Sequence, residues 1–188
     1  TGGPDAALVE YRVQFDSVFD PISYQGVPDI RIIVYKGYPA MAMVRLPTRQ
    51  SGGKANLHQG AVGAGVDIAT GRTRGAVSGN DRIEVHPDTL SPIDGTIVPH
   101  WHRIVEIAAL GREVSGLGYL GVDLVIDRDL GPLMLEMNAR PGLNIQIANA
   151  AGLKPRFRAI EKHLGESPEA ASPPERAAIS RQLMLGLT

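Results

Sequence analysis

The sequence predicts an α+β fold in which an antiparallel sheet is backed by helices, rather than a doubly wound parallel sheet. Strand-like segments dominate the first half of the chain, and helical patterns become frequent in the second half. Two pairs of strand-like segments, at 29–47 and 120–138, are each joined by a short turn, as antiparallel neighbours are. One strong amphipathic helix, from Pro99 to Val114, is expected between these two pairs.

Five strands are expected in the first half of the chain: one at 6–15, two at 29–46 and two at 66–77. ALVEYRVQF (6–15) has the apolar pattern of a strand, and a connection rich in proline and glycine follows it. DIRIIVYKGYPAMAMVRL (29–46) predicts two strands that turn at Lys36-Gly37-Tyr38-Pro39. The stretch 47–65 is expected to be a polar, glycine-rich loop, and VDIATGRTRGAV (66–77) a second short hairpin.

The helix expected from Pro99 to Val114 has the clearest pattern in the chain. Proline suits a first helical turn, and Gly116 is expected to end the helix. Its apolar residues recur at helical spacing and predict a buried stripe: Val98, Trp101, Ile104, Val105 and Ala108.

The second half of the chain continues with two strands and then helices. LGVDLVID (120–127) and PLMLEMN (132–138) predict antiparallel neighbours, and helices are expected at 142–152 and 155–165. We place the main domain at residues 1–165. Residues 166–188 are expected to form a linker, at 166–175, and a short amphipathic end helix.

The composition is that of an ordinary globular protein. Of 188 residues, 43% are hydrophobic and 21% charged, and the net charge of -1 gives no overall field that would recruit nucleic acid or an anionic membrane. The absence of cysteine excludes disulfides and thiolate metal sites and fits a cytoplasmic location. The sequence shows no apolar run of spanning length. Because the sequence starts at Thr1 within a strand-like region, we expect a fragment or a processed form.

Polar residues interrupt the two late strands in a pattern that suggests a metal site. Glu136 and Asn138 project from one face of their strand, about 7 Å apart, while Leu135 and Met137 are expected to face a core. A short turn would bring Asp123 within reach of Glu136. Two carboxylates and an amide oxygen suit Mg²⁺, with Mn²⁺ as an alternative. Structural salt bridges from the acids to arginines such as Arg140 would be the simpler interpretation.

Arg140-Pro141-Gly142 follows the expected metal ligands directly. An arginine can bind a phosphate through two parallel hydrogen bonds. Gly142 is expected to open a helix whose N-terminal amides favour anions. A divalent cation, an arginine and a helix N-terminus at one place point to a nucleotide polyphosphate.

These residues resemble a known family. GVDLVIDRDLGPLMLEMNARPGL resembles the metal-binding segment of ATP-grasp enzymes, and DIRIIV, MVRLP and KANLHQGAVGAG resemble matching segments of ribosomal-protein glutamate ligases. The α-L-glutamate ligase-like proteins, also described as sugar-transfer-associated ATP-grasp proteins, are the most similar group. The resemblance covers roughly residues 6–155.

The resemblance implies an ATP-dependent carboxylate–amine ligase that forms an acyl phosphate from an acid and passes the acyl group to an amine. Asp123, Glu136 and Asn138 match the metal-ligand positions. Glu10, Tyr11 and Val13 match the inter-lobe segment that receives adenine, although a simple strand is the alternative. The segment would form the C-terminal lobe of an ATP-grasp core, without the upstream lobe that supplies phosphate-binding lysines. We therefore expect it to be inactive alone.

Further site residues are expected on the early strands and in the loop after them. In the family pattern Arg31 and Arg45 would contact phosphate or the acid, with Arg45 and Arg140 in catalytic roles; pairing within the protein is the alternative. Asn56 and His58 match the NLH motif, with ligand and structural roles both open.

Two alternative functions stay open from the sequence. One is an ATP-grasp enzyme of carboxylase or phosphotransfer type, and the other is a non-catalytic nucleotide-binding or scaffold module. The acid, the amine acceptor and the oligomeric state are not specified by the sequence.

Overall fold

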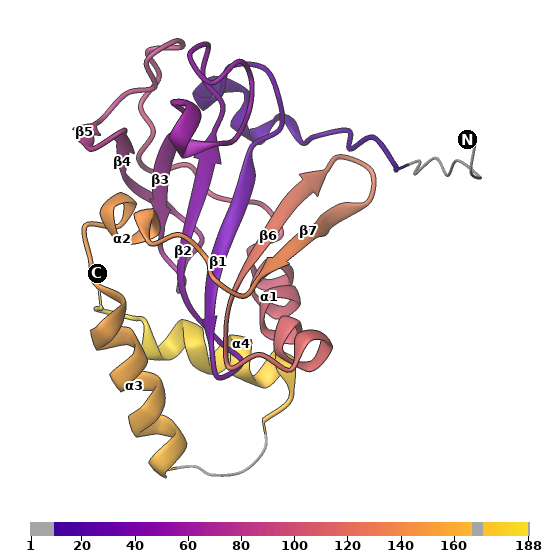
Figure 1. The fold of residues 1–188 in the computed structure, drawn as a ribbon, viewed down its shortest axis with the longest axis vertical. Helices are drawn as coiled ribbons and strands as arrows, with labels where there is room; N and C mark the ends of the chain where they lie inside the picture. The colour runs from indigo at the N-terminus through magenta and orange to yellow at the C-terminus, as the bar shows by residue number, and fades with distance from the viewer. Residues whose placement is uncertain (1–9, 167–170, 188) are drawn as a thin grey trace, which may run out of the picture.

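A computed structural model describes residues 10–166 and 171–187. In this part of the chain, seven strands form one antiparallel sheet in the order β5-β4-β3-β2-β1-β6-β7 (Figure 1). The fold is therefore α+β, as expected. The strands are β1 (Asp29–Tyr35), β2 (Tyr38–Leu46), β3 (Val62–Val66), β4 (Thr73–Ser78), β5 (Asp81–Ile83), β6 (Tyr119–Asp127) and β7 (Gly131–Asn138). The helices are α1 (Trp101–Ser115), α2 (Asn144–Ala148), α3 (Leu153–Glu166) and α4 (Pro173–Leu183), with short 3-10 helices η1 (Ser17–Ile22) and η2 (Leu57–Gln59).

The β1–β2 hairpin turns at Lys36 and Gly37, within the expected segment. Both residues have positive φ (52° and 86°), as a two-residue hairpin turn of the primed type requires. Pro39 lies in β2 rather than in the turn, opposite Val34. The register then shifts by one residue, because Ala40 is an extra residue in β2: Ile33 pairs with Met41 and Asp29 with Arg45.

The β6–β7 hairpin contains a second bulge. Leu124 pairs with Met134, but Asp123 pairs with Glu136, so Leu135 is the extra residue. The expectation that Leu135 faces a core is therefore wrong: its side chain is 53% exposed. Met137 is half-buried and packs against the core as expected.

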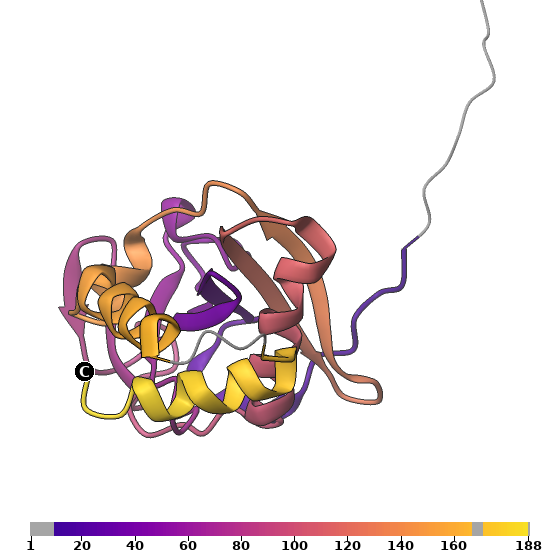
Figure 2. The same cartoon turned by 90° about the horizontal axis from the view of Figure 1, so that it is seen from below.

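One face of the sheet is covered by α1 and α4, which also pack on each other (Figure 2). Val98 and the α1 residues of the expected stripe are all buried. The helix begins at Trp101 rather than Pro99, because His100 adopts a left-handed conformation that cannot continue a helix. Gly116 ends α1, as expected.

The opposite face is covered by α2, α3 and the segment that connects β7 to α2 (Figure 1). The helix expected over 142–152 is only the five residues of α2, while α3 is longer than expected. The glycine-rich loop ends earlier than expected, because β3 begins at Val62. Gly65 lies in β3, where a Cβ atom would be 2.9 Å from the Ala148 carbonyl oxygen, so glycine allows α2 to approach the sheet.

A strand was expected over residues 6–15. Residues 6–9 lie outside the described part of the chain, and for residues 10–15 the prediction is wrong. Residues 10–14 are extended without strand pairing, and Phe15 makes a single bridge to Asp127. Asp127 holds this segment, because its Oδ2 accepts hydrogen bonds from the Gln14 amide (2.7 Å) and the Tyr11 hydroxyl (3.1 Å). Two backbone hydrogen bonds flank the bridge, from the Asp16 amide to the Ile126 carbonyl (3.0 Å) and from the Arg128 amide to the Gln14 carbonyl (2.6 Å). The segment is therefore anchored by one bridge and the Asp127 side chain rather than by a ladder.

The C-terminal helix begins inside the stretch expected to be a linker. Residues 167–170 of that stretch lie outside the described residues. Ser172 and Glu175 form a capping box, and Pro173 occupies the first turn of α4. Within residues 10–166 and 171–187, no helix has the length and apolarity needed to cross a bilayer. The domain boundary at 165 stays a prediction.

Candidate active site

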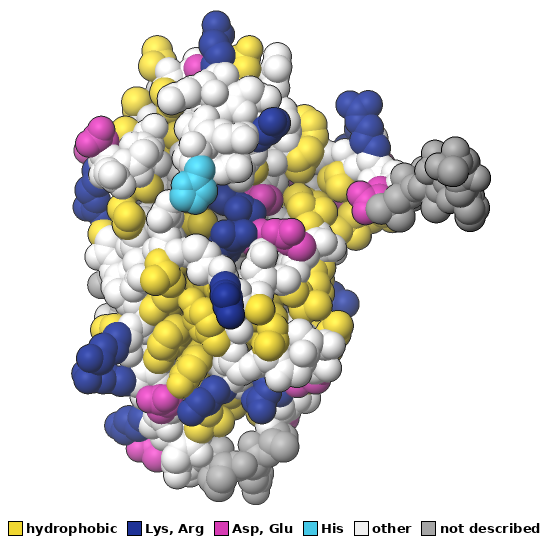
Figure 3. All heavy atoms as spheres, in the orientation of Figure 1, with side chains coloured by type: hydrophobic (Ala, Val, Ile, Leu, Met, Phe, Trp, Pro, Cys, Tyr) yellow, Lys and Arg dark blue, Asp and Glu magenta, His cyan; other side chains and the backbone are white. Residues whose placement is uncertain are grey.

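Charged side chains form a row across four adjacent strands, β2, β1, β6 and β7, on the face that α2 partly covers. Strand register places them there: Arg45 is opposite Asp29, Arg31 is opposite Asp123, and Asp123 is opposite Glu136. Directly paired residues share a face, so all five side chains point the same way. Figure 3 shows basic and acidic side chains gathered at the centre of this face, with a histidine beside them.

Asp123 lies at the middle of this row and is 1% exposed. Its Oδ1 accepts a hydrogen bond from Arg31 Nε (2.7 Å), and its Oδ2 accepts from Arg31 Nη2 (2.5 Å) and Arg45 Nη2 (2.8 Å). Burial would raise the pKa of Asp123, but these arginines lower it overall. Asp123 is thus a buried, ionised carboxylate whose charge is compensated by two guanidinium groups.

Asp29 was not singled out from the sequence and completes this charged group. It pairs with Arg45 through two hydrogen bonds, one of them 2.6 Å long, so Arg45 bridges Asp29 and Asp123. Burial raises the pKa of Asp29 to about 6, despite the opposing effect of Arg45. The available signal was an acidic residue at the start of a hairpin strand and an arginine at the end of its partner.

Glu136 and Asn138 extend the row towards solvent. Asn138 Nδ2 donates a hydrogen bond to Glu136 Oε1 (2.9 Å), so the two side chains share a face, as expected. In the described residues, no three His, Cys, Asp or Glu side chains cluster closely enough to hold a metal by themselves. The donor set nevertheless fits a hard divalent cation that shares its shell with phosphate oxygens, because two carboxylates and an amide oxygen are available.

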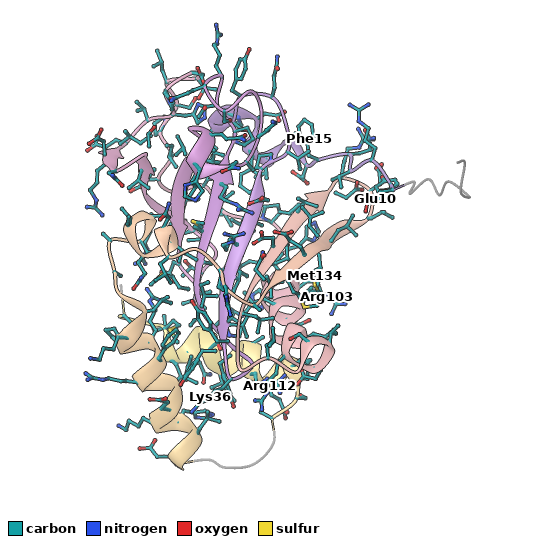
Figure 4. All side chains as sticks on the ribbon, viewed as in Figure 1. Glu10, Phe15, Lys36, Arg103, Arg112 and Met134 are labelled. Carbon is teal, nitrogen blue, oxygen red and sulfur yellow. The ribbon has the colours of Figure 1, made fainter. Side chains whose placement is uncertain are left out.

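An apolar cavity of about 360 Å³ opens beside the charged row, next to Asp29. Of the three residues expected to receive adenine, Val13 lines this cavity, whereas Glu10 and Tyr11 do not. Glu10 lies farther out along the N-terminal segment than Phe15 (Figure 4). The apolar side chains of the wall are Val13, Phe15, Val27, Val125 and Leu135.

A smaller polar pocket of about 50 Å³ lies on the other side of the arginines. Asn56, His58, Arg31 and Arg45 are among its lining residues. Asn56 also has a structural role, because its Oδ1 caps η2 by accepting the His58 amide (3.0 Å). Asn144 lines the pocket too and had no signal in the sequence beyond its place two residues after Gly142.

Arg140 is not brought into the charged row. Its side chain is exposed, and no hydrogen bond or ion pair is formed by it in the described part of the chain. The sequence alternative to a metal site was a salt bridge from the acids to an arginine such as Arg140. Asp123 does form salt bridges, but its partners are Arg31 and Arg45. The anion-binding argument for the helix after Gly142 is also weakened, since α2 has only five residues.

The model of one protein family, described as sugar-transfer associated ATP-grasp, matches residues 1–162. The chain belongs to this family. A search of curated proteins gave no match. ATP-grasp proteins are in general ATP-dependent ligases or nucleotide-binding proteins, and the antiparallel sheet with its helices is consistent with an ATP-grasp lobe.

Proposed function

We propose that this ATP-grasp chain is the C-terminal portion of an ATP-dependent carboxylate–amine ligase. The observation that carries the proposal is the order of features on one sheet face. Asp29 lines the apolar cavity and its partner Arg45 lines the polar pocket, so this charged pair of the row lies between the two. A purine, a polyphosphate and a small acid would occupy these three places in that order.

The apolar cavity suits a flat heterocycle. Val13 and Phe15 approach it from the N-terminal segment, and Leu135 and Val125 from the β6–β7 hairpin. A purine held between these side chains would remove their apolar surface from water, which favours binding by about 25 cal/mol per Å². The backbone amide and carbonyl of Val13 form no hydrogen bond within the described residues and would be available to the edge of the base, whereas those of Gln14 are already used.

The charged row suits phosphate transfer. Arg31 and Arg45 would neutralise oxygens of the transferring phosphoryl group through charge-assisted hydrogen bonds. Asp123, Glu136 and Asn138 would hold Mg²⁺, which would supply charge neutralisation on the polyphosphate when bound. An acid in the polar pocket would attack the γ-phosphorus, and the bond to ADP would break. An amine would then attack the acyl carbon, lose a proton and release inorganic phosphate.

A non-catalytic nucleotide-binding module is the second candidate. The observation in its favour is that both carboxylate oxygens of Asp123 already accept hydrogen bonds from arginines. A catalytic site must therefore rearrange these contacts or use the remaining lone pairs when Mg²⁺ and nucleotide arrive. Turnover with an acid and an amine would separate the two candidates.

Glu136→Gln tests the proposal, because it removes an anionic oxygen and keeps the side-chain shape. In calorimetry on the full-length protein we expect Mg²⁺ binding in the presence of ATP to weaken by about tenfold or more, with an unchanged fold. Glu84→Gln, exposed and near the far edge of the sheet, is the matched control. Wild-type Mg·ATP binding and turnover in Glu136→Gln would remove Glu136 from the metal site.

A further inference from the structure

His86 is a buried histidine outside the charged row, in the segment that follows β5. Its ring contacts Pro47, the first residue of the β2–β3 loop (47–61). Figure 1 shows the segments after β2 and after β5 at the same end of the sheet. The β2–β3 loop carries Asn56 and His58, which line the polar pocket. His86 therefore joins two segments that are far apart in the sequence, and one of them forms part of the candidate site.

Both ring nitrogens of His86 have a partner, and the partners determine which nitrogen carries a hydrogen. Nε2 lies 3.0 Å from the carbonyl oxygen of Pro47, which can only accept, so Nε2 donates. Nδ1 accepts a hydrogen bond from the Asp88 amide (3.3 Å), so Nδ1 carries no hydrogen. A proton on Nδ1 would point at the Asp88 N–H group and would place a charge in a buried site. This arrangement therefore requires the neutral ring.

A second contact joins the same two segments. The Asp88 carboxylate accepts a hydrogen bond from the Arg49 amide (2.7 Å) and lies 3.9 Å from the Arg49 side chain. Burial lowers the pKa of His86, and the Pro47 carbonyl and the Asp88 carboxylate oppose this only in part. Within the described residues, Asp88 is the charged group that acts on the ring. We call the two contacts, His86–Pro47 and Asp88–Arg49, the loop clamp.

The residues held by the loop clamp also close the β2–β3 loop. Between the two clamped residues lies Thr48, whose buried hydroxyl donates to the Gly60 carbonyl (2.8 Å) near the far end of the loop. Gly60 ends η2, and Asn56 is the N-cap of the same short helix. Loss of the loop clamp would therefore loosen the turn that presents Asn56 and His58 to the polar pocket.

We propose that His86 is a positioning residue for the polar pocket: its neutral ring keeps the β2–β3 loop closed, and the loop opens when the ring gains a proton. A role in catalysis rests on the proposed function, whereas the closing of the loop does not. In an open loop the ring is hydrated and its pKa returns to the ordinary value of 6.5. The open population should then rise about tenfold from about pH 7.5 to about pH 5.5, because the open form takes up a proton that the closed form does not.

Two measurements on the full-length protein without nucleotide test this inference. Their results do not depend on the proposed function, which calorimetry with Mg·ATP tests separately. The first is a long-range nitrogen–proton NMR spectrum of the wild type at about pH 7.5. It should show His86 with a hydrogen on Nε2 and none on Nδ1. A hydrogen on Nδ1 would overturn the proposal, and no variant is needed for this result.

The second measurement is amide hydrogen exchange, corrected for the intrinsic rate of each amide. The Arg49 amide reports on the loop clamp, and the Ala61 amide, which donates to the Asn56 carbonyl (3.1 Å), reports on the pocket turn. In the wild type, protection of both amides should fall about tenfold from about pH 7.5 to about pH 5.5.

Two variants assign the effect to His86. His86→Gln should keep the loop closed at both pH values, because its amide can still donate to Pro47 but does not titrate. His102→Gln, exposed on α1, should keep the wild-type dependence on pH. Wild-type protection that is independent of pH, or the same dependence in His86→Gln, would overturn the proposal. A fall at Arg49 without one at Ala61 would show that His86 does not position the pocket.

Discussion

At the scale of single residues, the metal site we propose depends on the competition for Asp123. Arg31 and Arg45 already neutralise this buried carboxylate, at distances of 2.5–2.8 Å. A cation alone must displace favourable contacts to bind there. A cation that arrives with a polyphosphate offers the displaced arginines new anionic partners. This explains why we expect Mg²⁺ to bind with ATP rather than alone.

Replacement of Arg31 tests this competition. In Arg31→Met, Asp123 loses the arginine that donates two hydrogen bonds to it. We expect the affinity for Mg²⁺ without nucleotide to rise about tenfold, which corresponds to a binding free energy more favourable by about 1.4 kcal/mol. Affinity for ATP should fall. Mn²⁺ titration followed by electron paramagnetic resonance measures the first effect, with Arg103→Met on the exposed side of α1 as control. Unchanged affinity for the free cation would show that Arg31 does not compete.

Asp29 should give the protein a distinctive dependence of stability on pH. Its pKa in the folded state is raised from 3.8 to about 6, so the folded state binds a proton more tightly than the unfolded state. The stabilising contribution of that proton is complete below about pH 4 and is lost as the pH rises through about 6. Between about pH 4 and pH 6, the free energy of unfolding of the wild type should therefore fall by about 3 kcal/mol relative to that of Asp29→Asn. Urea unfolding of both proteins between pH 4 and 8 measures the difference, and parallel profiles would disprove it.

At the scale of elements, two β-bulges assemble the charged row. If Leu135 were paired in the ladder instead of bulged, the regular register from the Asp127–Gly131 pair would put Glu136 opposite Val122, on the face away from Asp123. If Ala40 were paired in the same way, Arg45 would lie on the opposite face from Asp29 and Arg31. Each bulge thus turns a set of functional side chains to the same face.

The Leu135 bulge also places an apolar side chain in the wall of the larger cavity. Leu135→Ala should weaken ATP binding about tenfold, because part of the apolar contact with the purine is lost. Stability should change little, since the side chain is 53% exposed. Fluorescent-nucleotide titration is the measurement, and Leu185→Ala, 65% exposed at the C-terminal end, is the control. Equal affinities in the two variants would place the purine elsewhere.

At the scale of the whole molecule, Arg176 joins α4 to the rest of the fold. Its Nε donates to the Gly37 carbonyl (3.1 Å), its Nη2 to the Ala109 carbonyl (3.3 Å), and it pairs with Glu113. One buried side chain therefore connects the β1–β2 turn, α1 and α4. This raises the question whether the segment after residue 165 folds with the main domain.

Arg176→Met answers that question. If α4 belongs to the cooperative unit, losing these hydrogen bonds should lower the free energy of unfolding by about 2–3 kcal/mol and the Tm by about 5–10 °C. Arg158→Met, exposed on α3, should leave the Tm within about 1–2 °C. A wild-type Tm for Arg176→Met would indicate that α4 is a separate appendage.

Local patterns in the sequence determined the class of fold and much of the candidate site. The buried stripe of α1, the hairpins and the candidates Asp123 and Glu136 follow from alternation and helical spacing, which depend on neighbours only a few residues away. Arg31 and Arg45 became candidates through the family resemblance. The ATP-grasp family also follows from short motifs, and the match over residues 1–162 confirms it.

Only the tertiary structure decided which of these residues meet. Phe15, Leu135 and Asn144 entered the site through contacts between segments far apart in the chain, for which local patterns carry no signal. Asp29 entered it through the register of the β1–β2 hairpin. The two bulges determined which side chains share a sheet face. Successive side chains of a strand alternate between the two faces, so one extra residue moves all later side chains to the other face. The N-terminal segment is not a strand because a single bridge and the Asp127 side chain join it to residues more than a hundred positions away.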